Sequence, residues 1–182
     1  MSPRERVVAS LLYPLLAWLA VLLVGMPAVT LLHELGHAVA AALAVGGRVT
    51  VVQGPAPARI AVSVWRLDLR LHGPIGPHQG MIGWAMWGPH QARWRHAVAM
   101  AAGPLVSGLC AVGCLLAAPH VPPLWHLALD LLAGASTLQM LSSGLPLRYG
   151  RWFGSYAGQA SDGLRIRRLL QGSPEPRPPV LL

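Results

Sequence analysis

The chain has 182 residues, of which 54% are hydrophobic and only 11% charged, and its formal net charge is +8. A soluble domain carries about a quarter charged residues, so this composition excludes an ordinary soluble protein and predicts an integral membrane protein. The arginines fall between the apolar runs, where the positive-inside rule places them, so the positive charge requires no nucleic acid partner.

Two apolar runs open the chain, at residues 7–24 and 28–45, and each is long enough to cross the hydrocarbon core of a bilayer. Gly25-Met26-Pro27 separates them. These residues allow either a tight turn between two antiparallel spans or a kink in one long helix. The hairpin is the preferred interpretation, because it places the arginines that precede the first run on the same side as those that follow the second.

The second run contains His33-Glu34-Leu35-Gly36-His37. Positions i and i+4 of a helix share one face, so the imidazoles of His33 and His37 can aim at a common point. Glu34 can reach a water molecule bound at that point. This is the H-E-x-x-H arrangement of zinc peptidases, in which two histidines hold the metal and the glutamate is the general base. The alternative is a chance match, but burying these groups in an apolar segment is costly unless a metal ion satisfies them.

Residues 46–96 form a polar insert between the second and third apolar runs. Residues 59–71 alternate between apolar and polar or charged side chains, strictly from Trp65 onward, which predicts a half-buried strand. Residues 49–53 are a candidate partner strand, with residues 54–57 as the connection. Residues 73–94 predict an irregular loop at the membrane interface. The histidines of the insert share no ligand spacing and are more simply interpreted as polar residues than as metal ligands: His72, His78, His90 and His96.

Two further spans are expected at residues 97–118 and 124–147. The first contains Gly103-Pro104, a break that a membrane helix tolerates only where it packs against protein or lines a wet cavity. The second carries His126 and Asp130 at i and i+4, which predicts a polar contact near the start of the helix. Four spans in all return the chain to its starting side, so both termini are predicted to be cytoplasmic.

Asp162, in Ser161-Asp162-Gly163, is the candidate third ligand. A catalytic zinc site uses three protein ligands and keeps one position open for water, and a carboxylate qualifies. Residues 171–182 contain four prolines and predict a disordered tail. Residues 1–170 then form a single membrane-embedded domain. The two cysteines, at i and i+4 in one apolar run, are interpreted as packing residues.

The order of these motifs resembles the site-2 protease family of zinc intramembrane metalloproteases over roughly residues 30–170. The similar elements are HELGH in one span, a strand-bearing insert, Ala-Gly-Pro-Leu in the next span, then Leu-Pro-Leu and Asp-Gly. The resemblance implies a three-helix core that holds zinc through His33, His37 and Asp162 near the cytosolic face of the membrane. Ser107 and Ser143 stand where the family usually has asparagine, which predicts a different substrate clamp.

The sequence therefore predicts an α-helical membrane protein with about four transmembrane helices and a zinc-dependent peptidase activity. The resemblance implies that its substrates are transmembrane or membrane-associated proteins and peptides, and Glu34 would activate the attacking water. An alternative from another class is an inactive membrane scaffold of the same fold that binds a partner helix or peptide. A weaker alternative is a metal-handling membrane protein that uses the histidines of the insert.

Overall fold

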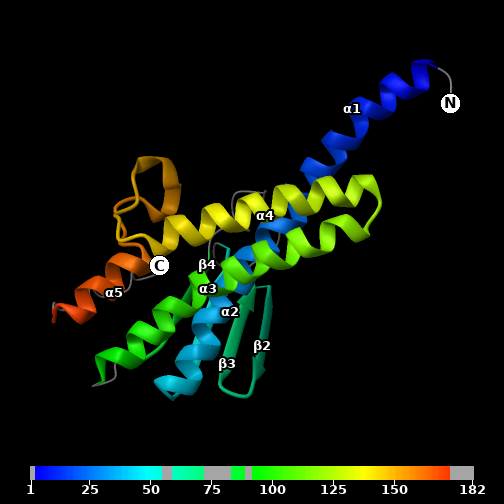
Figure 1. Ribbon diagram of the computed structural model, residues 1–182. Coiled ribbons are helices and arrows are strands. Elements are labelled where there is room, and N and C mark those ends of the chain that lie inside the picture. Colours follow the sequence, from blue (N-terminus) through cyan, green and yellow to red (C-terminus); the bar gives the residue numbers. More distant parts are fainter. Residues whose placement is uncertain (1–2, 55–58, 72–82, 89–91, 173–182) are drawn as a thin grey trace.

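The computed structural model describes residues 3–54, 59–71, 83–88 and 92–172. Most of these residues are helical, and a small sheet packs beside the helices (Figure 1). The helices are α1 (Pro3–Ala20), α2 (Met26–Ala44), α3 (Arg93–Ala117), α4 (Pro123–Gly144) and α5 (Asp162–Leu170), with the short turns η1 (Val21–Gly25), η2 (Ala118–His120) and η3 (Arg151–Tyr156). The strands are β1 (Val49–Gln53), β2 (Ile60–Val64), β3 (Leu67–Leu71) and β4 (Gly83–Met86).

The first two apolar runs form one continuous helix through α1, η1 and α2, so the predicted hairpin is wrong. The junction η1 is a π-helical turn in which the N–H of Met26 donates to the carbonyl of Val21, five residues back. This wider turn accommodates Pro27, which lacks an N–H, without ending the helix. Gly25 does not reverse the direction of the chain but allows α4 to pack closely against this helix, because a Cβ there would meet the Cδ1 atom of Leu132 in α4 at 2.9 Å.

Among the described residues, two helical segments are long and apolar enough to cross a membrane, Leu12–Ala44 and Arg93–His120. The predicted helical class is confirmed, but the number of expected spans is not: the first two form one segment, and α4, where the fourth was expected, is not among these candidates. The prediction that both termini lie on one side depended on an even number of spans. It is not supported, because α1 begins at one end of the helical assembly while α5 lies at the other (Figure 1).

The insert forms a four-stranded sheet with the strand order β2-β3-β1-β4. The stretch predicted as one strand is a hairpin instead, in which β2 and β3 pair antiparallel across a turn at Trp65, whose φ is 52°. A positive φ at this position is typical of the primed hairpin turns. The predicted partner β1 does pair with β3, in parallel. Strand β4 lies in the stretch predicted to be irregular, of which 73–82 and 89–91 lie outside the described residues, as does 55–58 of the predicted connection.

The sheet packs on the helices through β1, whose valines meet alanines of α2 and α3. The buried residues of this core are Ala38, Ala41, Ala42, Val49, Val51 and Ala99. Small side chains also let α2 and α3 approach each other closely beside the HELGH motif: a Cβ on Gly36 would meet the carbonyl oxygen of Ala102 at 2.9 Å. The motif is thereby enclosed between α3 on one side and the sheet on the other.

Candidate metal centre

Three side chains converge at one point, two from α2 and one from α5. The Nε2 atoms of His33 and His37 lie 3.1 Å apart. The Oδ2 atom of Asp162 lies 3.4 Å from the first and 3.3 Å from the second. Zinc bonds of about 2.0–2.1 Å at tetrahedral angles separate neighbouring ligand atoms by about 3.3–3.4 Å. The three atoms therefore have the spacing of one face of a tetrahedral zinc site, and the residues fit this ion.

Hydrogen bonds to α3 set the tautomer of both imidazoles. The Nδ1–H of His37 donates to the carbonyl of Ala99 over 2.8 Å. Ser107 accepts from the Nδ1–H of His33 at 2.8 Å, since its own hydroxyl donates to Oε1 of Gln139 in α4 over 3.2 Å. With Nδ1 bonded to α3, each Nε2 points toward Asp162, and a neutral imidazole in this position offers its Nε2 lone pair to a metal ion. Such outer partners orient metal-binding histidines and raise their basicity.

Glu34 is buried beside the triad and lies against the edge strand β4. A Cβ on Gly83 would meet Cγ of Glu34 at 2.6 Å, so glycine is what allows the strand to pass so close. The backbone N–H of Ala85 donates to the carboxylate. The general base predicted from the motif is thus held next to the two histidines, with its carboxylate oriented by backbone rather than by another side chain.

Asp162 is positioned by the residue before it. Ser161 is the N-cap of α5, and its hydroxyl oxygen accepts from the N–H of Leu164 at 3.2 Å. The same oxygen accepts from the N–H of Leu147 at 3.1 Å and donates to the carbonyl of Leu145 over 2.6 Å. One serine therefore caps the helix and ties it to the segment that follows α4. Asp162 follows as the first residue of α5, where a helix N-terminus favours a carboxylate.

Two glycines allow the four helices around the site to meet in pairs, α3 with α2 and α5 with α4. A Cβ on Gly103 of α3 would overlap the imidazole of His37. A Cβ on Gly163 of α5 would overlap the carbonyl of Gly144 at the end of α4. These close approaches explain why Gly-Pro and Asp-Gly occur where they do. The proline of the first pair is accommodated within α3, which stays continuous from Arg93 to Ala117.

The carboxyl of Asp162 is ionised in this setting. Burial by itself would raise its pKa, but the positive charge of protonated His37 and hydrogen bonds from both protonated imidazoles outweigh burial and hold the pKa of Asp162 below its usual value. The pKa values of the two tyrosines that follow α4 shift upward instead. Burial, together with the carboxylates of Asp162 and Glu34, raises the pKa of Tyr149 and of Tyr156. Both phenols stay protonated, while the ligand set carries one negative charge that suits a divalent cation.

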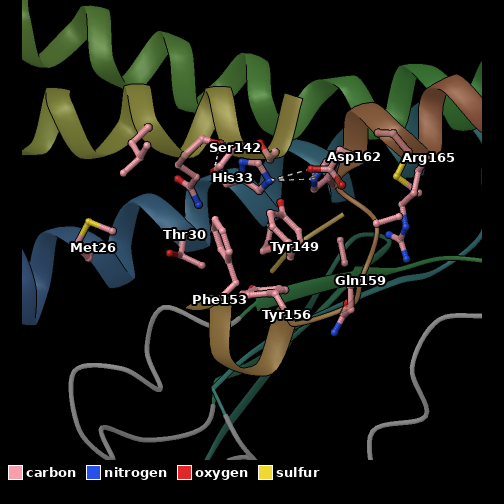
Figure 2. Close-up of a pocket in the computed structure, with 18 of the residues that line it drawn as sticks. Met26, Thr30, His33, Ser142, Tyr149, Phe153, Tyr156, Gln159, Asp162 and Arg165 are labelled. Atoms are coloured by element: carbon pink, nitrogen blue, oxygen red, sulfur yellow. Dashed lines mark hydrogen bonds and ion pairs between the residues drawn. The ribbon is translucent and has the colours of Figure 1, made fainter. Parts of the chain in front are cut away.

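The triad opens into an elongated pocket between α2, α4 and the segment that joins α4 to α5. Figure 2 shows Met26 and Thr30 at one end of this pocket and Gln159 and Arg165 at the other, with His33 and Asp162 between them. Gln159 and Arg165 make the second end polar. The aromatic rings of Tyr149, Phe153 and Tyr156 line the wall below the triad (Figure 2).

The structure brings together all four residues predicted for the site. Of the histidines in the insert, His96 instead accepts a hydrogen bond from Nε1 of Trp87 at 3.0 Å. His72, His78 and His90 lie outside the described residues. The contact expected between His126 and Asp130 is present at 3.3 Å, away from the triad, and both cysteines are free. The sequence gives no spacing that links the supporting residues to the motif: Ser107 and Gln139, which form the hydrogen-bond chain from His33, and Ser161, which caps the helix of Asp162. It gives no sign either that Tyr149 lines the pocket beside the triad.

Comparison with known proteins adds no relationship, since no protein family, no curated protein and no solved structure matches this chain.

Proposed function

We propose that this protein is a zinc-dependent intramembrane peptidase of the site-2 protease type. The observation that carries the proposal is the triangle of His33, His37 and Asp162, with both Nε2 atoms facing the carboxylate and Glu34 buried beside them. Three ligands with a glutamate alongside are the arrangement of a catalytic zinc site, whereas structural zinc sites use four protein ligands.

The apolar surface supports a membrane location. In the most hydrophobic windows of the two long segments, only 17% and 33% of the residues are buried, whereas the core helix of a soluble protein would be mostly buried. Large apolar side chains point outward from these segments along their length. Examples that are more than half exposed are Leu23, Val24, Leu43, Leu105, Leu109 and Leu116. A lipid environment removes this surface from water.

The orientation follows from the charges. Arginines cluster around the sheet, the start of α3 and α5, at the end of the helical assembly that carries the metal centre. We infer from the positive-inside rule that this end faces the cytoplasm. The continuous helix through α1 and α2 then begins on the opposite side of the membrane. The protein is multi-pass in this arrangement, with its metal centre near the cytosolic face.

A zinc ion bound at the triad supplies Lewis acidity and makes water a stronger acid. Glu34 accepts a proton from the attacking water as the oxygen of that water bonds to the carbonyl carbon of the scissile peptide. The C–N bond then breaks, and Glu34 returns that proton to the leaving amine. The N–H of Ala85 keeps the carboxylate of Glu34 oriented for both transfers.

The substrate is a transmembrane or membrane-associated polypeptide that enters the site in an extended form, because a helical carbonyl is shielded from attack. Strand β4 is an edge strand, and the N–H and carbonyl of Gly83 point away from β1, where the hydroxyl of Tyr156 bonds both. An extended chain can pair with this edge next to Glu34 once that hydroxyl moves aside.

The decisive experiment compares three proteins purified in detergent. The wild type is expected to hold about one equivalent of zinc and to cleave dye-quenched unfolded casein. Asp162→Ala is expected to lose the metal, and Glu34→Gln to keep it while cleavage falls by about 10²–10⁴-fold. Zinc with equal cleavage in wild type and Glu34→Gln would contradict the mechanism. Zinc without cleavage of casein or of a random decapeptide mixture would favour the inactive scaffold.

A further inference from the structure

Tyr149 is held rigidly in the segment that joins α4 to α5. Its N–H donates to the carbonyl of Gln159 over 2.9 Å, and its carbonyl accepts from the N–H of Gly158 at 2.8 Å. Next to it, Arg148 and Ala160 form an isolated antiparallel bridge. These contacts tie the backbone of Tyr149 to the stretch that leads directly into Asp162, so the tyrosine and the third ligand are positioned by the same piece of chain.

The ring of Tyr149 is fixed as well. Its centroid lies 4.8 Å from that of Phe153 and 5.8 Å from that of Tyr156, so aromatic rings pack against it within the pocket wall. Figure 2 shows the hydroxyl end of this ring directed toward the side chains of His33 and Asp162. The carboxylates of Asp162 and Glu34 are both close enough to act on the phenol electrostatically.

The two tyrosines of this wall differ in what their hydroxyl groups do. Tyr156 donates to the carbonyl of Gly83 and accepts from its N–H, at 2.9 and 2.8 Å. The hydroxyl of Tyr149 makes no hydrogen bond to any residue in the part of the chain that the structure describes. It is therefore a preorganised donor that faces the metal centre and is available to a bound molecule.

We propose that Tyr149 is a catalytic residue that donates its O–H to the oxyanion that develops on the scissile carbonyl. This inference rests on the proposed peptidase function. As the water oxygen bonds to the carbonyl carbon, the C=O pi electrons move onto oxygen, and the hydrogen bond from Tyr149 stabilises that charge without transfer of its own proton. The oxygen returns its electrons when the C–N bond breaks, and the proton on Glu34 goes to the amine.

The environment keeps this donor in the form that the role requires. Burial, reinforced by the nearby carboxylates of Asp162 and Glu34, raises the pKa of Tyr149, so the phenol remains protonated across the physiological range. A phenolate at this place would repel the developing oxyanion. A neutral O–H that is aimed at a charge formed only in the transition state contributes to kcat more than to substrate binding.

The test substitutes the chain's tyrosines one at a time, as Tyr149→Phe, Tyr156→Phe and Tyr13→Phe. Each protein is assayed for zinc content and for cleavage of dye-quenched casein in detergent. Each is also titrated with two Leu-Ala dipeptide inhibitors, a phosphonamidate and a mercaptoacyl compound. The phosphonamidate carries tetrahedral anionic oxygens, whereas the thiol ligates zinc through sulfur and offers no oxyanion. The ratio of the two affinities isolates the oxyanion contact from any change in the metal or the pocket.

Tyr149→Phe is expected to keep one equivalent of zinc, to lose about 100-fold in kcat with little change in KM, and to weaken the phosphonamidate about 100-fold more than the thiol. Tyr156→Phe is expected to leave the ratio of the two affinities unchanged. Tyr13, which is half exposed on α1, is expected to tolerate phenylalanine in every assay. The fall in kcat and the selective loss of phosphonamidate affinity in Tyr149→Phe share one cause, the lost hydrogen bond to the oxyanion, so they are expected together.

An unchanged kcat and an unchanged affinity ratio in Tyr149→Phe, alongside inactive Glu34→Gln, would overturn the role of Tyr149 and leave the peptidase intact. Loss of zinc in Tyr149→Phe would also overturn it, because the tyrosine would then be structural. A wild-type protein that binds zinc but cleaves nothing and ignores the phosphonamidate would overturn both the proposed function and this inference.

Discussion

The two halves of the candidate metal centre are constructed differently. The histidine half lies within one helix, where the i, i+4 spacing aligns both imidazoles and α3 orients them through Ala99 and Ser107. The aspartate half lies at a junction, where the segment after α4 turns back and Ser161 caps α5. The first half depends on helical periodicity, while the second depends on a set of turns and tertiary contacts.

This difference separates two ways in which the site can fail. The histidine half would persist in any context that keeps α2 helical, and only its fine orientation depends on neighbours. The aspartate half would be lost if α5 shifted, even though its helix stayed intact. Substitutions that act on one half alone should therefore have different consequences for zinc affinity and for stability, and three of them test the comparison.

The largest effect is expected for Gly163→Ala. The new Cβ would overlap the carbonyl of Gly144, so α5 must move and carry Asp162 away from the histidines. Zinc affinity is expected to fall by at least about 100-fold, more than loss of a hydrogen-bond partner of a ligand usually costs. Competition with a chelating dye measures the affinity. Gly113→Ala is the matched control, because a Cβ at that helical position meets nothing within 4 Å; equal affinities in the two variants would contradict the close packing of α5.

An intermediate effect is expected for Ser107→Ala, which acts only on the histidine half. It removes the partner of His33 Nδ1 and releases Gln139, so the imidazole is less well oriented. Zinc affinity is expected to fall about 10–100-fold, with the fold retained. Ser136→Ala is the control, since Ser136 is also fully buried but its hydroxyl has no partner among the described residues. If both alanine variants bound zinc equally well, the hydrogen bonds that connect His33 through Ser107 to Gln139 would have no role in zinc binding.

The smallest effect on the metal is expected for Ser161→Ala. The variant loses the N-cap hydrogen bond of α5 and two further hydrogen bonds, which together should cost about 2–4 kcal/mol of stability. Asp162 keeps its helix and its packing, so zinc affinity should change less than about tenfold. Unfolding in mixed detergent, followed by circular dichroism, gives the stability. Ser143→Ala, whose hydroxyl bonds only within its own helix, is the comparison. A Ser161→Ala protein as stable as the wild type would mean that the cap contributes nothing to the stability of the aspartate half.

How much could be predicted from the sequence follows the same division. His33, Glu34 and His37 were identified from their spacing, because a helix converts four residues of separation into one face. Asp162 was placed through the resemblance and through the need for a third ligand, and the structure brings its carboxylate to the imidazoles. Ser107 could not have been assigned to His33 from the chain, since 74 residues separate the two.

Backbone course was predicted less well than the ligands. Gly25 and Pro27 indicate a break, and a hairpin and a kinked helix satisfy that local signal equally. The continuous helix is distinguished by the packing of α4, whose Leu132 occupies the space left by the absent Cβ of Gly25. Similarly, the alternation over residues 59–71 gave no sign of the turn at Trp65, because a two-residue turn continues the period of the strands around it.

By itself, the amino-acid sequence determined what is local in this protein: its apolar helices, the shared face of the two histidines and the acid that lies next to them. Periodicity and composition are properties of neighbouring residues, so they can be read without a fold. Only the tertiary structure decided how Asp162 meets the two imidazoles, which serine orients His33 and which tyrosine faces the candidate metal centre. Those choices depend on helices approaching through glycines far apart in the chain, and contact between distant segments leaves no spacing in the sequence.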